Sequence, residues 1–340
     1  MSIPTLTFFN NKGGVGKTTL VYHLSWMFAE LGLTVLVVDC DPQANLTAAF
    51  QDDETLVSLW EPTPRAKPAT VFQAIKPLME VSDIAQVKAQ QMAPGLHLIA
   101  GDLGLSAFED QLSEQWGKAL SEDSAMRAML VLSAFWRVAQ ATGNRLKADV
   151  IIFDVGPNLG AINRSVLISS DYVLVPLAAD LFSLQGLRNL GPALEKWRKG
   201  WDERCHRMER IEKPLPQGRA EPIGYVALQH QERLSRPVQA YASWLQRIPG
   251  EYRQQLLDDG DPERAAIPAI DADKYCLARL RHYKSLIPFA QEARKPIFKL
   301  RAADGAIGSH ATSVARAYRD FNVLAHKILE RIGIPVPASS

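Results

Sequence analysis

The sequence has few cysteines and no long apolar run. Its three cysteines, Cys40, Cys205 and Cys276, form no CxxC pair and no even framework. Such usage is typical of a reducing compartment and argues against a disulfide scaffold or a structural zinc site. No stretch approaches the ~20 apolar residues of a membrane span, and Met1–Thr5 does not resemble a signal peptide. We therefore expect a soluble, cytoplasmic protein.

The sequence also lacks an excess of charge of either sign. It has 38 Lys and Arg against 37 Asp and Glu, which gives a net charge of +1. A protein that coats nucleic acid with its whole surface would be more basic, so any DNA contact must come from a local patch. Hydrophobic residues make up 47% of the 340 residues, which excludes a disordered chain and allows a large core.

Short, continuous apolar runs indicate strands that are buried on both faces of a parallel sheet. Thr5–Phe9, Val35–Val38 and Val150–Phe153 are of this kind, and a helical pattern at Lys17–Leu31 separates the first two. The predicted fold is therefore an α/β, doubly wound, mostly parallel sheet flanked by helices. Further strands are expected at Leu96–Ala100, Val173–Leu177, Ile223–Leu228 and Pro296–Leu300, and helices at Val71–Met79, Ser106–Gln140, Leu184–Trp197 and Ser313–Ile332.

We expect one domain over residues 1–340, because no repeat or low-complexity tract divides the chain. Several segments are less regular or more charged than the predicted sheet and read as largely helical insertions. The expected insertions are approximately 51–95, 107–147, 200–220 and 231–285.

A glycine-rich loop follows the first predicted strand and precedes the first predicted helix. In this context the glycines let backbone N–H groups point at phosphate oxygens, and the helix N-terminus adds partial positive charge. Lys17 is placed to reach the β- and γ-phosphates, and the Thr18 hydroxyl to ligate Mg²⁺. Asn11 stands where the strict P-loop pattern has glycine. The expected phosphate-binding residues are Gly13, Gly14, Val15, Gly16, Lys17, Thr18 and Thr19.

The run from Lys12 to Thr19 resembles the KGGxGKT[ST] variant P-loop of the ParA/MinD/Soj ATPases, and the ParA-like branch in particular. That resemblance implies an ATP-dependent homodimer in which Lys12 reaches the phosphates bound by the partner. A second cation beside a transferring phosphate acts as an arginine finger does. Alternatively, Lys12 is a solvent-facing lysine of the loop.

Two further segments resemble the motifs of this family. By the likeness of Val35–Leu46, Asp41 would orient the attacking water and Asp39 would support the magnesium site; the alternative for both is a turn or helix-capping aspartate. By the likeness of Val150–Gly160, Asp154 would hold Mg²⁺ through water. After Asp154 the chain departs from the family, because Gly156 stands in a loop where the family has two prolines.

Contacts with the base and with partners are less clearly encoded. Gln229 follows a predicted strand and is a candidate for hydrogen bonding to adenine, or else a surface glutamine. The resemblance implies sequence-indifferent DNA binding by the ATP-bound dimer and a partner, not identified by the sequence, that stimulates hydrolysis. The preferred DNA-binding candidates are Arg279, Arg281, Lys284, Arg294 and Lys295.

The predicted function is thus an ATP-binding and ATP-hydrolysing dimeric switch for DNA partition or intracellular positioning. One alternative is a regulatory ATPase that acts with a neighbouring effector and binds no DNA. Another is a MinD-like ATPase that cycles on a membrane, although the tail after Ser313–Ile332 has no basic face and no bulky aromatics. A metabolic ligase or kinase of the same fold is a further alternative.

Overall fold

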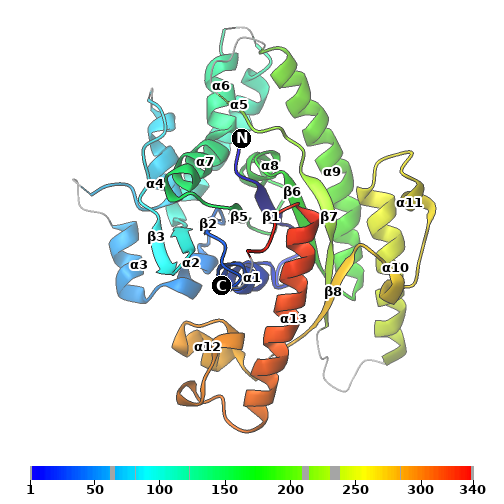
Figure 1. Cartoon of the computed structure of the whole chain (residues 1–340). Helices are drawn as coiled ribbons and strands as arrows, with labels where there is room; N and C mark the ends of the chain where they lie inside the picture. Colours follow the sequence, from blue (N-terminus) through cyan, green and yellow to red (C-terminus); the bar gives the residue numbers. More distant parts are fainter. Residues whose placement is uncertain are drawn as a thin grey trace.

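An eight-stranded sheet forms the centre of the molecule (Figure 1). The computed structural model describes residues 2–61, 66–80, 82–121, 123–208, 214–229, 238–283 and 285–337, with the backbone only at 229 and 238–241. The strands are β1 (Thr5–Phe8), β2 (Val35–Asp39), β3 (Gln90–Ala93), β4 (Leu96–Ile99), β5 (Val150–Asp154), β6 (Tyr172–Ala178), β7 (Glu221–Gln229) and β8 (Cys276–Arg281).

The strand order is β3-β4-β2-β5-β1-β6-β7-β8, and every neighbouring pair is parallel except β3 and β4. This arrangement confirms the predicted doubly wound fold. Because β1, β2 and β5 are adjacent and parallel, the residues that follow them meet at one edge of the sheet. In open α/β sheets that edge is where ligands bind.

Alternating side chains of the strands supply two apolar cores, one on each face of the sheet. On β2, Val35 and Val37 contribute to one core, whereas Leu36 and Val38 contribute to the other. Successive side chains of a strand point to opposite faces, so a wholly apolar strand requires cover on both sides. The continuous apolar runs of the sequence are therefore explained by helices packed above and below the sheet.

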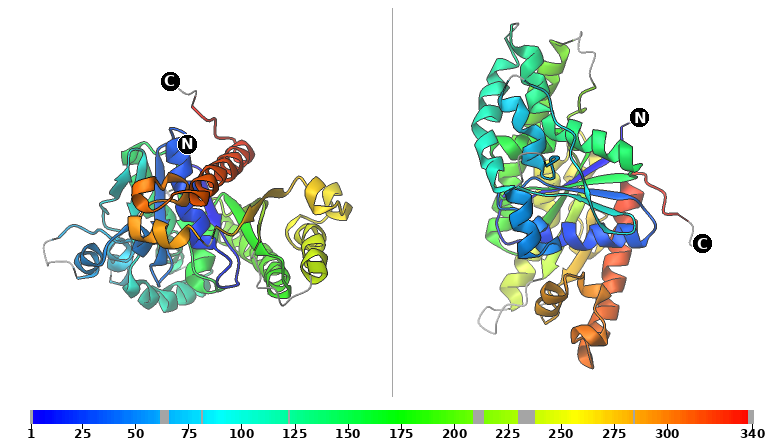
Figure 2. Two further views of the ribbon diagram at one scale, coloured as in Figure 1. Left: turned by 90° about the horizontal axis from the view of Figure 1, so that it is seen from below. Right: turned by 90° about the vertical axis from the view of Figure 1, so that its left-hand side faces the viewer.

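The helices form a layer on each face (Figures 1 and 2). One layer comprises α1 (Lys17–Glu30), α2 (Asn45–Phe50), α12 (Ile287–Ala293) and α13 (Ser309–Arg331). The other comprises α4 (Val71–Ile75), α5 (Glu109–Lys118), α6 (Ala125–Leu132), α7 (Ala134–Leu146), α8 (Ala161–Ile168), α9 (Leu181–His206) and α10 (Val238–Leu256). The remaining helices are α3 (Asp53–Trp60), α11 (Pro262–Ala265) and the 3₁₀ turns η1 (Lys76–Met79), η2 (Leu103–Phe108), η3 (Ile270–Ala272), η4 (Ile297–Lys299) and η5 (Ala302–Asp304).

The prediction of a last strand at Pro296–Leu300 is wrong. That segment contains the short turn η4, and the backbone N–H of Ile297 donates to His23 Nε2 at 3.1 Å instead of to a neighbouring strand. The last strand is β8, which lies inside the segment 231–285 that was expected to be mostly helical. Arg279 and Arg281 therefore belong to the central sheet.

A bulge explains why β8 does not look like a strand in the sequence. Val226 of β7 pairs with Ala278, whereas the preceding Tyr225 pairs with Cys276, so Leu277 is an extra residue on β8. The bulge turns both Leu277 and Leu280 into the core. Two apolar residues three positions apart match the spacing of a helix, and the sequence pattern is therefore misleading here.

Three other segments differ in detail from the sequence prediction. The polar antiparallel strand β3 was not expected. The helical region predicted at Ser106–Gln140 is divided into η2, α5, α6 and α7, and the helix predicted at Leu184–Trp197 is the 26-residue α9, which continues through the charge-rich stretch. Local composition predicts that these segments are helical, whereas their ends depend on packing.

A buried ion pair joins α10 to the end of the sheet that contains β7 and β8. Arg253 Nη2 and the Tyr225 hydroxyl each donate to Asp273 at 2.7 Å, and both charged side chains are almost fully buried. Replacing Asp273 with alanine leaves the guanidinium without its partner. We expect the free energy of unfolding to fall by about 3 to 5 kcal/mol, measured by urea denaturation.

Asp271 provides the matched control for this prediction. It pairs with Arg279, but its side chain is 71% exposed. Asp271→Ala should change the free energy of unfolding by no more than about 1 kcal/mol. If Asp273→Ala were as mild as this control, the buried pair would not stabilise the attachment of α10.

Candidate nucleotide site

The loop between β1 and α1 has the backbone geometry of a phosphate cradle. Gly14 and Gly16 adopt positive φ angles of 73° and 78°, which favour glycine, and Gly16 directly precedes the first residue of α1. Asn10 supports the loop from below: its Nδ2 donates to Pro176 O at 2.8 Å, and its Oδ1 accepts from the Lys12 amide at 2.9 Å. The loop is thus held in place by the neighbouring strand β6.

Lys17 is the first residue of α1 and its side chain is largely buried inside the loop. Its ammonium lies 3.5 Å from the Lys12 carbonyl oxygen. Burial lowers the pKa of Lys17, while the negative charges of Asp154 and Asp41 act in the opposite direction. An ammonium held among carboxylates and loop carbonyls is placed to receive phosphate oxygens.

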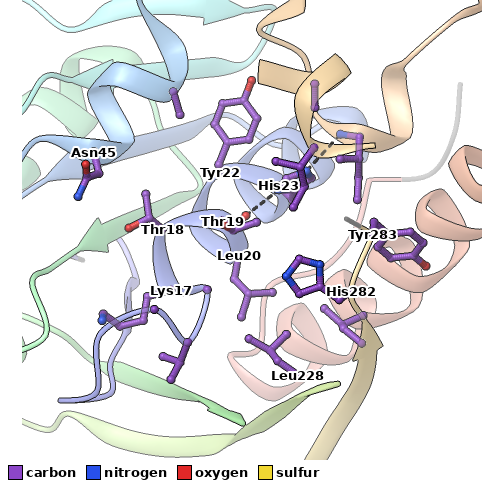
Figure 3. A pocket seen from close by; sticks show the side chains of 18 of the residues that line it. Lys17, Thr18, Thr19, Leu20, Tyr22, His23, Asn45, Leu228, His282 and Tyr283 are labelled. Atoms are coloured by element: carbon purple, nitrogen blue, oxygen red, sulfur yellow. Dashed lines mark hydrogen bonds between the residues drawn. The ribbon is translucent and has the colours of Figure 1, made fainter. Parts of the chain in front are cut away.

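A cavity of about 990 Å³ extends from this loop across α1 to the end of β8 and to α12 (Figure 3). The predicted residues Gly13, Gly14, Val15, Gly16, Lys17, Thr18 and Thr19 all line it, and so does Asp41. The cavity has a polar end at the loop and a more apolar end near Leu228, His282 and Tyr283. That division matches the triphosphate and the nucleoside of a nucleotide.

Several residues at the apolar end were missed from the sequence. Arg281, His282 and Tyr283 follow β8, and Gln291 comes from α12. Ends of parallel strands are the usual ligand positions in such sheets. That signal was hidden because β8 was not recognised as a strand.

His23 joins the cavity wall to the C-terminal part of the chain. Its Nε2 accepts from the Ile297 amide, so Nδ1 bears the proton and donates to Thr19 O at 2.7 Å. Burial lowers the pKa of His23 to about 4. The imidazole is therefore neutral at physiological pH and serves to position α1 against η4.

Asp41 lies between the phosphate loop and the loop that follows β5. Its Oδ1 accepts from the Gln43 amide at 3.0 Å, and its own amide donates to Asp39 Oδ1 at 3.2 Å. A Cβ added at Gly156 would lie 3.3 Å from Asp41 Oδ1, so the two backbones approach closely here. The carboxylate is buried and faces the cavity.

Asp39 is turned toward the protein interior. Its Oδ2 accepts from the Thr47 amide at 2.9 Å and from the Thr47 hydroxyl at 2.7 Å. Burial raises the pKa of Asp39, and the Thr47 hydrogen bonds oppose that shift. The carboxylate therefore fixes α2 beside the site, and its oxygens are already engaged by the protein.

Asp154 ends β5 directly beside Asp39, its register partner on β2. Both of its carboxylate oxygens are buried and accept no hydrogen bond within the described residues. Burial raises the pKa of Asp154, and the charges of Asp39 and Asp41 raise it further, while Thr18 and Lys17 act against the shift. Buried oxygens without partners, next to a threonine hydroxyl, fit a Mg²⁺ ion that retains water ligands.

No group of three or more His, Cys, Asp or Glu residues in the described ranges is arranged to hold a metal by itself. This agrees with the preference of Mg²⁺ for one or two protein ligands together with substrate phosphates and water. Within the same ranges, no helix is both long enough and apolar enough to cross a membrane.

Lys12 is paired within its own chain. Its ammonium forms an ion pair with Asp180, which also caps α9 by accepting from the Ser183 amide at 2.8 Å. Beside this pair lie Leu181 and Phe182, whose side chains are 50% and 69% exposed. Lys12 therefore lies at an exposed apolar rim, directed away from the interior of its own phosphate loop.

Two of the DNA-binding candidates are already paired with carboxylates. Arg279 forms an ion pair with Asp271, and Lys295 forms one with Asp304 at 2.7 Å. Exposed pairs of this kind are weak and can exchange for phosphate.

The other candidates occupy different positions. Arg281 lines the nucleotide cavity, and Arg294 Nε donates to Gln51 O at 3.2 Å on the exposed surface. Lys284 lies outside the described residues, as does the side chain of Gln229, whose backbone ends β7. The proposed adenine contact of Gln229 therefore remains a prediction.

A mostly parallel sheet with a phosphate loop after β1 and an acidic residue after β5 defines a P-loop nucleotide-binding protein. The family model described as AAA domain matches residues 3–205, more than half of the chain. The chain belongs to this family and to its ParA/MinD type of P-loop ATPases.

Comparisons with individual proteins support this placement. The chromosome partitioning protein ParA of Caulobacter vibrioides is 27% identical over 193 residues, which cover 57% of this chain and 62% of that protein. The chain thus spans less than two thirds of the relative's length. A Corynebacterium diphtheriae protein has a similar fold, with a TM-score of 0.66, 22% identity and coverage of 97% of this chain and 99% of that one. The Cyanothece McdA–ATP complex gives 0.61 and 14%, with 99% of both chains covered.

Proposed function

We propose that this chain is an ATP-hydrolysing dimeric switch of the ParA type that works in DNA partition or intracellular positioning. The observation that carries the proposal is the pairing of a phosphate loop and Lys17 with Asp154, whose buried oxygens lack a protein partner. The hydrolytic group Asp41 lies at the same end of the cavity.

In this proposal each end of the cavity binds a different part of ATP. The backbone amides of Gly13–Thr19 and the Lys17 ammonium bind the phosphates. The nucleoside occupies the end near Leu228, His282 and Tyr283, where rings and aliphatic groups cover the base. Gln229 remains a candidate for the edge of adenine.

Thr18 and Asp154 would hold Mg²⁺ beside the bound phosphates. When bound, Mg²⁺ neutralises charge that develops on the phosphate oxygens. Asp39 acts in a supporting role, because its hydrogen bonds to Thr47 fix the segment that carries Asp41.

Asp41 orients the water that attacks the γ-phosphate and accepts its proton. Its position is defined by the Gln43 amide and by the close approach of Gly156. The loop around Gly156 contacts both the phosphate loop and Asp41, so we infer that it senses whether the γ-phosphate is present.

Dimerisation follows from the position of Lys12. Its ammonium rests on Asp180 at an exposed rim that includes Leu181 and Phe182. A second copy of the chain would cover this rim and offer its own ATP phosphates to Lys12 in place of Asp180. Binding of ATP by both copies then favours the dimer.

DNA binding is proposed for the part of the chain that projects with α12 and α13 (Figure 2). Arg294, Arg316 and Arg319 are exposed there. Arg281 and Arg316 both lie near Tyr283, since both act to lower its pKa against the dominant raising effect of burial. A local group of arginines fits sequence-indifferent contacts with phosphates of nucleoid DNA in the cytoplasm.

The test is binding to random-sequence duplex DNA with ATP, with ADP and without nucleotide, over a series of salt concentrations. We expect binding with ATP alone, and a double variant with Arg294→Glu and Arg316→Glu should bind at least about tenfold more weakly. Its dependence of log K on log salt should be shallower by about 2, because each phosphate contact contributes about 0.9.

Lys118→Glu is the control, since Lys118 is exposed on α5, where it pairs with Glu114. It should bind DNA like the unmodified chain. A chain that hydrolyses ATP and dimerises but binds no DNA with any nucleotide would contradict the DNA proposal. That result would favour a regulatory ATPase acting on a protein effector.

A further inference from the structure

A carboxylate from outside the nucleotide motifs grips the loop that follows Asp154. Glu109 is the first residue of α5, in the segment 107–147 that the sequence marks as an insertion. Its Oε1 accepts a hydrogen bond from the Ala161 amide, and its Oε2 accepts one from the Ile162 amide at 2.9 Å. These amides open α8, so Glu109 caps that helix from another element.

Gly160 shows how close this contact is. Its φ and ψ angles of −75° and −177° are extended and suit any residue, so backbone conformation does not require glycine. A Cβ added at Gly160 would overlap Glu109 Oε1 and crowd Asn158 Oδ1. Glycine is needed at this position because the Glu109 carboxylate occupies the space of a side chain.

From α8 the contact continues to the catalytic edge through Asn163. This buried side chain donates from Nδ2 to Gly156 O at 2.8 Å and to Asn158 O at 2.6 Å. Gly156 in turn approaches Asp41 Oδ1. Glu109 thus acts on Asp41 through α8, Asn163 and the loop, without touching the nucleotide cavity.

The far end of α5 is also anchored. The Trp116 ring lies between the guanidinium groups of Arg164 on α8 and Arg204 on α9, at 4.3 and 3.9 Å. Arg204 also donates two hydrogen bonds to the Trp116 carbonyl. With both ends attached, α5 is a fixed support against which α8 and the loop are held.

We propose that Glu109 is a positioning residue that sets the loop Val155–Gly160 for ATP hydrolysis. The proposal rests on the proposed ATPase function. The capped state fixes Gly156 against Asp41, and loss of the cap lets α8 and the loop shift away from the hydrolytic geometry. The phosphate loop itself is unaffected, because it is held by Asn10 and by β6.

The test combines hydrogen exchange with steady-state kinetics on the full chain. Glu109→Ala should raise amide exchange at 160–162 at least about tenfold in nucleotide-free protein, because two charge-assisted hydrogen bonds are lost. It should lower kcat about tenfold and leave KM for ATP within about twofold. Glu109→Gln, which keeps one acceptor, should lie between. Asp110→Ala, the exposed neighbour on the same turn, should change neither readout.

Gly160→Ala provides an independent check. It should lower kcat as Glu109→Ala does, and the double variant should lose less than the product of the two single losses, because the steric conflict is removed. Unchanged exchange in Glu109→Ala would overturn the clamp, and faster exchange with unchanged kcat would overturn its role in hydrolysis. An unmodified chain that does not hydrolyse ATP would instead overturn the proposed function, while exchange would still report on the clamp.

Discussion

Replacing Lys12 with alanine is expected to lower the rate of ATP hydrolysis by about 10³-fold or more, the range measured when an arginine finger is removed. The reason is that Lys12 supplies positive charge to the phosphates of a second copy. Binding of ATP to the phosphate loop of the same chain should change by no more than a few-fold, because Lys17 and the loop amides remain. Single-turnover hydrolysis and equilibrium binding of a fluorescent ATP analogue measure the two effects separately.

The ion pair with Asp180 makes this prediction specific to a dimer. In the single chain Lys12 is held by its own carboxylate, at a rim that bears exposed Leu181 and Phe182. A lysine acting on the phosphates of its own chain would have no need of that rim. We therefore expect Lys12→Ala to fail in hydrolysis at all protein concentrations, whereas the unmodified chain should gain activity per chain as its concentration rises.

Mixing two inactive variants distinguishes action across the dimer from action within one chain. A dimer of one Lys12→Ala chain and one Asp41→Ala chain has one complete site, composed of Asp41 from the first chain and Lys12 from the second. If the variants are mixed equally before ATP is added, about one quarter of the unmodified activity should return, as expected for a symmetric two-site dimer. No recovery would contradict action across the dimer. Lys118→Ala, which changes an exposed lysine on α5, serves as the control.

The sequence was sufficient to predict those parts of the site that depend on local pattern. The strands before Asp39 and Asp154 are continuous apolar runs, and the glycine loop requires positive φ angles that few residues tolerate. These signals involve residues close together in the chain. Strand ends therefore placed Lys17, Asp41 and Asp154 at one edge of the sheet before the fold was known.

The remaining parts depend on contacts between distant residues. Glu109 looks like an ordinary acidic residue in the first turn of a helix, and only the fold brings it to α8, 52 positions away. The pairing of Lys12 with Asp180 spans 168 positions. The strand β8 was hidden by its bulge, and with it the residues His282 and Tyr283 of the cavity. No pattern of period 2 or 3.6 encodes such contacts.

Replacing Asp41 with alanine is the second change expected to have a large effect. Loss of a group that orients water and accepts its proton should lower the hydrolysis rate by about 10² to 10⁴-fold. ATP binding should persist, because the phosphate loop, Lys17 and Asp154 do not depend on Asp41 for their positions. The ATP-bound dimer should therefore accumulate, and on the proposed function it should stay on DNA after the unmodified chain has dissociated.

Light scattering and retention on DNA after a chase with excess ADP measure this accumulation. Asp53→Ala changes an exposed aspartate in the first turn of α3 and should behave as the unmodified chain does. Asp39→Ala is expected to differ from Asp41→Ala: the loss of its hydrogen bonds to Thr47 should lower ATP binding as well as hydrolysis. If Asp41→Ala lost binding and hydrolysis together, the carboxylate would be a structural support of the site. If it retained both, the attacking water would have to be oriented by another residue. Persistent dimers without hydrolysis are the result that assigns the catalytic role to Asp41.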